Sequence, residues 1–234
     1  MKVKFLLILF FNISYLYGQE NILTAKDAII KVQKKISTYT NIKLSFDFTI
    51  AGDNEFTNSD FEGILYVEKK KYFLEIKNFI KQINDGNLKY TINDDSKEVM
   101  VDSTDENSVN IFEPQKLLST LIKDYKISWD ITQKIFDGRN IRYINLEPKN
   151  SGFESGYYLI GIDFDYNLYK IIKIDNENLK STLRINTLEY NLKLNKDLFK
   201  FSKKNYTDYY IDSFWLGLQP VSYTHLTLPT NRCV

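Results

Sequence analysis

The chain has 234 residues, enough for one large all-β domain or two small ones. Its 31 basic residues nearly balance its 30 acidic ones, and the lysines are interspersed with Asp and Glu, so there is no positively charged field to bind nucleic acid. With one Cys and one His, the chain has no disulfide framework. The same scarcity argues against a triad, a thiolate nucleophile and a transition-metal site. A hydrophobic core therefore has to supply the stability.

The first 18 residues have the three-part layout of a secretory signal peptide. Lys2 and Lys4 precede the apolar run 5–11, and small or polar residues follow near Gly18. The apolar run is too short to cross a bilayer, and no Cys follows it at which the chain could be lipidated. We therefore expect residues 1–18 to be a signal peptide and the mature chain to be exported as a soluble protein. The alternative is a buried first strand.

The C-terminal end of the chain differs from the rest in residue pattern and composition. From Trp215 onward the alternating pattern stops, and the segment contains the only His and the only Cys, His225 and Cys233. We expect residues 215–234 to be a non-native, adapter-like tail, the alternative being a natural disordered tail. Neither His225 nor Cys233 is then interpreted as part of a site. Residues 19–214 show no linker and no composition break, so we count one domain there.

A helix is predicted from Thr24 to about Thr38. Thr24 and Asp27 have the spacing of a capping box, in which the two side chains satisfy backbone amides of the first turn. Apolar residues then recur at helical spacing and form one stripe, namely Ala25, Ala28, Ile29, Val32 and Ile36. Residues 41–50 follow with strict alternation of apolar and polar residues, which is typical of a strand with one buried face.

Residues 61–101 are predicted to form a four-strand meander. Apolar residues recur at every second position in four runs, 61–67, 72–76, 88–92 and 99–101. The three lysines of the corner 69–71 separate the first two runs. The Asn-Asp-Gly turn at 84–86 precedes the third run and supplies the left-handed backbone that a tight turn requires.

A second helix is predicted over residues 113–125. Pro114 fits its first turn, where no backbone amide is needed. Its narrow apolar face consists of Leu117, Leu118, Leu121, Ile122 and Tyr125. Six further runs have the residue pattern of strands and are separated by turn-forming residues, at 128–135, 139–147, 157–164, 168–175, 179–190 and 198–202.

These elements predict an α+β fold that is mainly antiparallel β. The connections between the runs are short, which favours antiparallel neighbours over crossovers. We expect about ten or eleven strands in one curved sheet. Two or three helices can cover only part of such a sheet, so we expect them to form a lid over its concave apolar face.

The candidate catalytic groups are paired carboxylates. Asp163 and Asp165 would share one face of a strand, and Asp94 and Asp95 sit together in a turn. The ordinary interpretation of both pairs is that they are solvated surface or turn residues. We therefore expect no enzyme activity, no cofactor and no metal site.

Binding is the function class that the residue pattern favours. Phe and Tyr are abundant, at 16 and 17 residues, and several fall on the inward positions of strands. A packed sheet core and an apolar cavity beneath the helices both fit this pattern. A cavity of that kind suits an acyl chain, whose burial contributes roughly 0.8 kcal/mol per methylene.

Several short motifs, in their order and spacing between residues 22 and 213, resemble one known family. In chain order they are Gly63-x-Leu-x-Val67, Tyr72-Phe-Leu-Glu-Ile76, Gln82-x-x-Asp-Gly86, Pro114-x-x-Leu-Leu118, Leu146-x-Pro-Lys149, Ile160-x-Ile-Asp163, Phe199-Lys-Phe201 and Tyr210-Ile-Asp212. The chain thereby resembles the periplasmic outer-membrane lipoprotein carriers, the LolA-like proteins.

The resemblance implies an unclosed β-barrel whose helices form a lid over an apolar interior. It implies a monomeric carrier that takes acylated lipoproteins from an inner-membrane exporter toward an outer-membrane acceptor. The residues expected to line its cavity are Phe46, Phe48, Leu65, Leu74, Ile76, Leu88, Tyr90, Leu117, Leu118, Leu121 and Ile122. Lys69 or Lys70 stands where the family has an arginine that pairs with the lid, and a lysine lacks the forked donors of arginine.

Two other hypotheses remain open. The same sheet could serve as a regulatory module that senses mislocalised lipoproteins or envelope stress. It could also be a structural β-domain whose core is filled and which binds no ligand. The volume and lining of any cavity beneath the helix at 114–125 would discriminate between the carrier hypothesis and the hypothesis of a structural β-domain.

Overall fold

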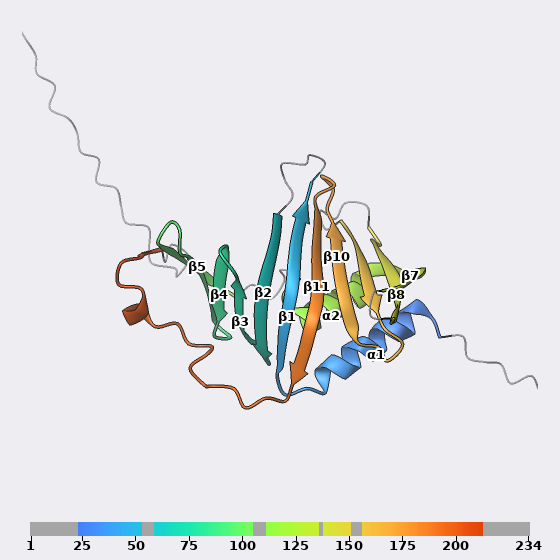
Figure 1. Ribbon diagram of the computed structural model, residues 1–234, viewed down its shortest axis with the longest axis horizontal. Helices are drawn as coiled ribbons and strands as arrows, with labels where there is room; N and C mark the ends of the chain where they lie inside the picture. The colour runs from blue at the N-terminus through green and yellow to red at the C-terminus, as the bar shows by residue number, and fades with distance from the viewer. Residues whose placement is uncertain (1–22, 53–58, 105–110, 136–137, 151–155, 213–234) are drawn as a thin grey trace, which may run out of the picture.

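The computed structural model describes residues 23–52, 59–104, 111–135, 138–150 and 156–212. The predicted signal peptide, 1–18, and the predicted tail, 215–234, lie outside these residues. The elements, labelled as in Figure 1, are α1 Ala25–Ser37, β1 Ile42–Ala51, β2 Ser59–Glu68, β3 Lys71–Ile76, β4 Ile80–Asn84, β5 Leu88–Asn93, β6 Glu98–Ser103, α2 Pro114–Asp124, β7 Tyr125–Lys134, β8 Asn140–Pro148, β9 Tyr157–Ile162, β10 Leu168–Ile174, β11 Lys180–Tyr190, the 3-10 turn η2 Lys203–Asn205 and β12 Tyr210–Asp212.

The twelve strands of the described residues belong to one sheet, in the order β12-β6-β5-β4-β3-β2-β1-β11-β10-β9-β8-β7. Two meanders, β2–β6 and β7–β11, flank β1, and every pairing is antiparallel except that of β12 with β6. Since β12 and β7 stand at opposite edges, the sheet is not closed. The predicted architecture is therefore confirmed, with twelve strands instead of ten or eleven and with two α-helices among the described residues.

Helix α1 begins as the capping box predicts. The backbone amide of Asp27 donates to Thr24 Oγ1 at 3.1 Å, and the backbone amide of Thr24 donates to Asp27 Oδ2 at 3.3 Å. These bonds satisfy amides of the first turn that have no partner within the helix. The predicted apolar stripe is buried along its whole length, so one complete face of α1 packs on the sheet.

Replacing Thr24 with alanine is expected to lower the free energy of unfolding by about 1 kcal/mol, because it removes the N-cap acceptor. Chemical denaturation of the two proteins measures the difference. Ser37→Ala is the matched control, since it removes a hydroxyl of α1 that bonds only to Lys34 O at the other end of the helix. Equal losses in the two variants would contradict a specific role for the cap.

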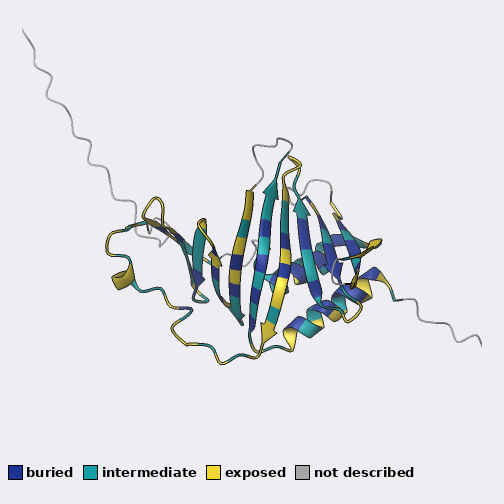
Figure 2. Cartoon of the chain, in the orientation of Figure 1, coloured by how far each residue is buried: buried dark blue, intermediate teal, exposed yellow. Residues whose placement is uncertain are grey.

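The two helices cover one face of one half of the sheet. Figure 1 shows α1 and α2 crossing the side of β1, β11, β10 and β8, whereas neither of these two helices lies over β4 and β5. The largest apolar core lies between these helices and the inward residues of β1–β3 and β7–β11, and Figure 2 shows this buried band. In α2, Pro114 occupies the first turn, while Leu117, Leu118 and Leu121 have no exposed surface.

The prediction of four strands between 61 and 101 is wrong by one. Ile80–Asn84 forms an additional strand, β4, between the second and third predicted runs. Lys81 and Gln82 are adjacent and both polar, so this strand lacks the alternation of apolar and polar residues by which a strand is predicted. The turn before it contains neither Gly nor Pro, and Asn78 supplies the left-handed backbone with φ 57°.

Two further boundaries differ from the predictions. Residues 198–202 form turns and not a strand, because Phe199 and Phe201 anchor this segment through side-chain packing instead of strand pairing. Figure 1 shows the segment after β11 running to the edge of the sheet at β5, where β12 joins β6. Strand β9 ends at Ile162, so Asp163 and Asp165 lie in the following turn and not on a strand.

Candidate functional site

The helix-covered face of the sheet brings together most of the apolar residues predicted to line a cavity. Eight of them belong to the largest core and are at most 7% exposed: Phe46, Phe48, Leu65, Leu74, Ile76, Leu117, Leu118 and Leu121. Ile122 is partly buried and packs against the same core. Strands β1–β3 and helix α2 thus present a continuous apolar interior.

Leu88 and Tyr90 lie on the opposite face. Phe73, Ile83 and Tyr90 are register partners on β3, β4 and β5, so they share a face, while Leu74 next to Phe73 points to the helices. Tyr90 stacks on Phe201 of the C-terminal segment, with ring centroids 4.3 Å apart. Leu88 and Tyr90 therefore pack against a second, smaller core on the face without helices.

An aromatic group fills the centre of the interior. Phe46 lies directly over Gly63, its register partner on β2, and a Cβ added to Gly63 would come within 2.3 Å of the Phe46 ring. Phe112, just before α2, contacts the rings of Phe46 and Phe48 with centroid distances of 5.6 and 5.4 Å. The segment leading into α2 is therefore anchored on β1, a contact that the sequence pattern alone does not reveal.

A few polar contacts attach α1 to its neighbours. Lys31 Nζ lies 3.3 Å from Tyr166 Oη and 4.7 Å from the ring centroid, and Lys35 Nζ donates to Asp165 O at 2.9 Å. Gln33 Nε2 donates to Ser119 Oγ of α2 at 2.8 Å. These contacts are exposed, and exposed polar contacts are individually weak. Apolar burial therefore provides most of the attachment of the helices to the sheet.

Lys69 and Lys70 form the exposed turn between β2 and β3, where Lys69 adopts φ 56°. The contact with the lid that the resemblance implies for one of them stays a prediction. The described contacts that do hold α1 involve Lys31, Lys35 and Tyr166. They could be predicted from the sequence only if the turn after β9 were known to lie beside α1.

A carboxylate lies where α2 meets the sheet. The side chain of Glu113 is 26% exposed, and Lys116 Nζ is 4.0 Å away. Burial raises the pKa of Glu113, and the positive charges of Lys116 and Lys89 only partly oppose this. The neighbouring Tyr72 is 2% exposed and its hydroxyl donates to Gln82 Oε1 at 3.2 Å. Burial also raises the pKa of Tyr72, with a smaller contribution from the charge of Glu113.

Replacing Glu113 with glutamine is expected to stabilise the fold at neutral pH. An acid with a raised pKa binds more protons in the folded state, so the wild-type protein gains stability as the pH falls through that pKa and stops gaining below the ordinary value of 4.5. The variant should lack this gain. Urea denaturation at several pH values measures it, and a variant less stable than wild type at neutral pH would contradict the assignment.

A small cavity of about 20 Å³ lies between the end of α1, the start of α2 and strands β1, β10 and β11. Its lining is mostly apolar and includes Ile36, Leu44, Leu168, Ile185 and Leu188. A space of this size holds no more than one water molecule. An acyl chain can therefore enter here only if the helices move away from the sheet.

The predicted carboxylate pairs are turn residues. Asp163 Oδ1 accepts from the backbone amides of Asp165 and Asn167, which shapes the turn between β9 and β10. Asp94 accepts from the hydroxyl of Tyr209 at 2.7 Å. Within the described ranges, no three His, Cys, Asp or Glu side chains gather as a metal site would require.

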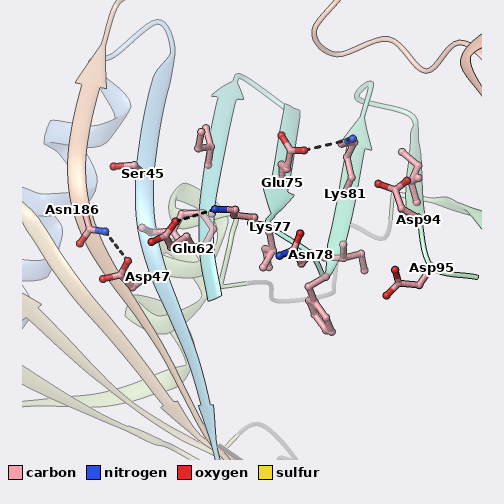
Figure 3. A pocket seen from close by; sticks show the side chains of 17 residues that line it. Ser45, Asp47, Glu62, Glu75, Lys77, Asn78, Lys81, Asp94, Asp95 and Asn186 are labelled. Carbon is pink, nitrogen blue, oxygen red and sulfur yellow. Dashed lines mark hydrogen bonds and ion pairs between the residues drawn. The ribbon is translucent and has the colours of Figure 1, made fainter. Parts of the chain in front are cut away.

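A larger hollow of about 740 Å³ lies on the face that the helices leave uncovered. Strands β11, β1, β2, β3 and β4 line it, together with Ile92 of β5 and the turn after β5 (Figure 3). Charged and polar side chains dominate its rim, namely Ser45, Asp47, Glu62, Glu75, Lys77, Asn78, Lys81, Asp94, Asp95 and Asn186. Apart from Asp94 and Asp95, no residue of this rim is a candidate from sequence, because the hollow depends on the register of five strands.

Comparison with solved structures finds several proteins that are similar to this chain at low sequence identity. A LolA superfamily protein from Nitrosomonas europaea has 10% identity and a TM-score of 0.42, with 76% of this chain and 98% of that chain covered. A putative outer membrane lipoprotein-sorting protein domain from Vibrio parahaemolyticus has 13% identity and a TM-score of 0.41, with 76% and 95% covered. The Mycobacterium tuberculosis lipoprotein LppX has 12% identity and a TM-score of 0.36, with 72% and 96% covered.

No protein-family model matches the chain, and no curated protein sequence matches it. In the part of the chain that the structure describes, no helix has the length and apolar character to span a membrane.

Proposed function

We propose that this protein is a carrier that binds the acyl chains of lipoproteins between its sheet and its two helices. The observation that supports the proposal most is the inner face itself. Eight buried apolar side chains from β1–β3 and α2 face one another across a boundary between separate elements. An acyl chain that replaced these contacts would find an apolar surface on both sides.

The helices are suited to such an exchange. The contacts of Lys31, Gln33 and Lys35 are exposed, while Gln115 Nε2 donates to Ile36 O and Trp129 Nε1 donates to Leu23 O in part-buried positions, so opening the lid breaks mainly apolar contacts and a few hydrogen bonds. A bound acyl chain would restore those contacts, at roughly 0.8 kcal/mol for each buried methylene. Opening and loading are then coupled, because the open state alone offers the apolar surface to the ligand.

The proposed route runs across the periplasm. A signal peptide at residues 1–18 would export the chain, an inner-membrane exporter would load it, and an outer-membrane acceptor would receive the lipoprotein. Mass spectrometry of the protein isolated natively from the envelope tests the cargo. Triacylated lipoprotein fragments should accompany it, whereas free fatty acids alone would point to a lipid carrier of another kind.

Acyl binding itself is tested with a dansyl-labelled fatty acid. The wild-type protein should enhance its fluorescence, and Leu118→Trp, which fills the interior, should weaken binding at least about tenfold. Lys123→Trp adds the same ring on the exposed side of α2 and is the control. Thermal denaturation shows that both variants are folded. Equal binding by both variants would contradict an interior site.

One observation favours a structural β-domain as the second candidate. Among the described residues, the cavity beside the end of α1 has a volume of only about 20 Å³, too small for an acyl chain while the helices are in place. If the wild-type protein fails to bind the labelled fatty acid at any concentration and carries no lipid when isolated, the structural domain is the better description.

A further inference from the structure

We propose that the hollow on the helix-free face binds a positively charged polypeptide segment that carries apolar side chains. The hollow lies on the opposite face of the sheet from the interior beneath the helices, since the side chains of a strand alternate between the two faces, although the interior residues Phe46 and Ile76 also border it. On β2, Leu65 belongs to the interior core, while its neighbour Ile64 lines the hollow. A ligand can therefore occupy the hollow without moving either helix.

The hollow has an apolar floor and a charged rim. Ile64 on its floor is 38% exposed and Phe79 at the turn before β4 is 47% exposed, unusually open positions for large apolar side chains. Figure 3 shows Asp47 and Asn186 at one end, Asp94 and Asp95 at the other, and Glu62 and Glu75 between them. A ligand that satisfies this surface needs both apolar and polar groups.

The charge of the rim favours a cation. Its lining includes five carboxylates, Asp47, Glu62, Glu75, Asp94 and Asp95, against two lysines, Lys77 and Lys81. Asp47 is satisfied within the protein, because Arg184 pairs with it and Asn186 Nδ2 donates to it at 2.8 Å. The remaining four carboxylates exceed the two lysines, and this excess would repel nucleic acid and anionic lipid.

The ion pairs within the rim are readily exchanged. Lys77 Nζ lies 3.9 Å from Glu62, with both side chains more than 70% exposed, and Lys81 Nζ lies 3.5 Å from Glu75. The side chains of the second pair are 25% and 49% exposed. Ion pairs open to solvent are weak, so cations of a partner can replace the lysines. Among the ion pairs of the described residues, none involves the carboxylate of Asp95.

The length of the hollow favours a polypeptide over a small cation. From Asn186 on β11 to Lys81 on β4 the lining crosses four strand spacings, about 19 Å at roughly 4.8 Å each. About six residues of an extended chain cover this distance. Alternating basic and apolar side chains along such a segment would reach the carboxylates of the rim and the floor at Ile64.

The test uses a fluorescein-labelled peptide of three Lys-Leu repeats and its Glu-Leu counterpart. Fluorescence anisotropy at low salt should show binding of the Lys-Leu peptide only. Glu75→Gln combined with Asp95→Asn should weaken it about tenfold. Asp130→Asn combined with Glu177→Gln changes the net charge equally at exposed sites outside the lining and should leave binding unchanged. Thermal denaturation shows that both variants are folded.

The other outcomes overturn the proposal. Equal weakening by the two double variants would show non-specific attraction to the net charge, and binding of the Glu-Leu peptide would show attraction to apolar surface alone. Leu118→Trp, which fills the interior, should bind the Lys-Leu peptide as well as wild type does. If it loses the peptide while folded, the peptide enters the interior and the hollow is not its site.

Discussion

Gly63→Ala is expected to lower the free energy of unfolding by about 2 kcal/mol, although it adds only one methyl group. The new Cβ would lie 2.3, 2.6 and 3.0 Å from three atoms of the Phe46 ring, and the first two distances are shorter than Cβ contacts in real proteins. Phe46 is 1% exposed and packs beneath Phe112, so its ring has little free space into which to move. The strands β1 and β2 would separate or the ring would leave its place over the glycine. Urea denaturation measures the loss.

A second substitution at Phe46 identifies the cause. Phe46→Leu removes the ring atoms that an alanine at position 63 would meet, so the double variant should lose less stability than the sum of the single losses. Strict additivity would show that the cost of Gly63→Ala arises elsewhere. A Gly63→Ala protein as stable as wild type would contradict the packing of this ring on the glycine.

Leu121→Ala is expected to lower the free energy of unfolding by about 3 kcal/mol, because Leu121 has no exposed surface and lies in the contact between α2 and the sheet. Lys123→Ala, two residues along the same helix and exposed, should change it by less than about 0.5 kcal/mol. Chemical denaturation compares the two.

The same variant also tests the lid. Removing the Leu121 side chain weakens the closed state and leaves space inside, so Leu121→Ala should bind the dansyl-labelled fatty acid more tightly than wild type while being less stable. A variant that loses stability and gains no affinity would indicate that the helices do not open during binding.

The helices and most strands follow from local patterns in the sequence. The capping box at Thr24 and the stripe from Ala25 to Ile36 are confirmed because both depend only on neighbours within one helix. Strand β1 is equally plain, since its apolar residues alternate and its inward side is buried. Strand β4 is missed because Lys81 and Gln82 interrupt the alternation on which such predictions rely.

Most residues of the candidate interior are also predicted from local apolar patterns. The placement of Leu88 and Tyr90, in contrast, depends on the register in which β4 pairs with its neighbours. Because the sequence pattern does not predict β4, it cannot show that Tyr90 pairs with Ile83. It therefore cannot show that Tyr90 lies on the opposite face of the sheet from Leu74. The C-terminal anchor at Phe201 is also hidden, because its partner Tyr90 is more than one hundred residues away in the chain.

The central claim is that an acyl chain binds between the helices and the sheet, and photo-crosslinking tests it most directly. A fatty acid with a diazirine near the end of its chain would be bound, irradiated and located by mass spectrometry of the peptides. The account predicts labels on inward residues such as Leu74, Leu118 and Leu121, lost when unlabelled fatty acid is added. Labels confined to the outer face around Ile64 and Phe79, or labels that excess fatty acid does not reduce, would contradict it.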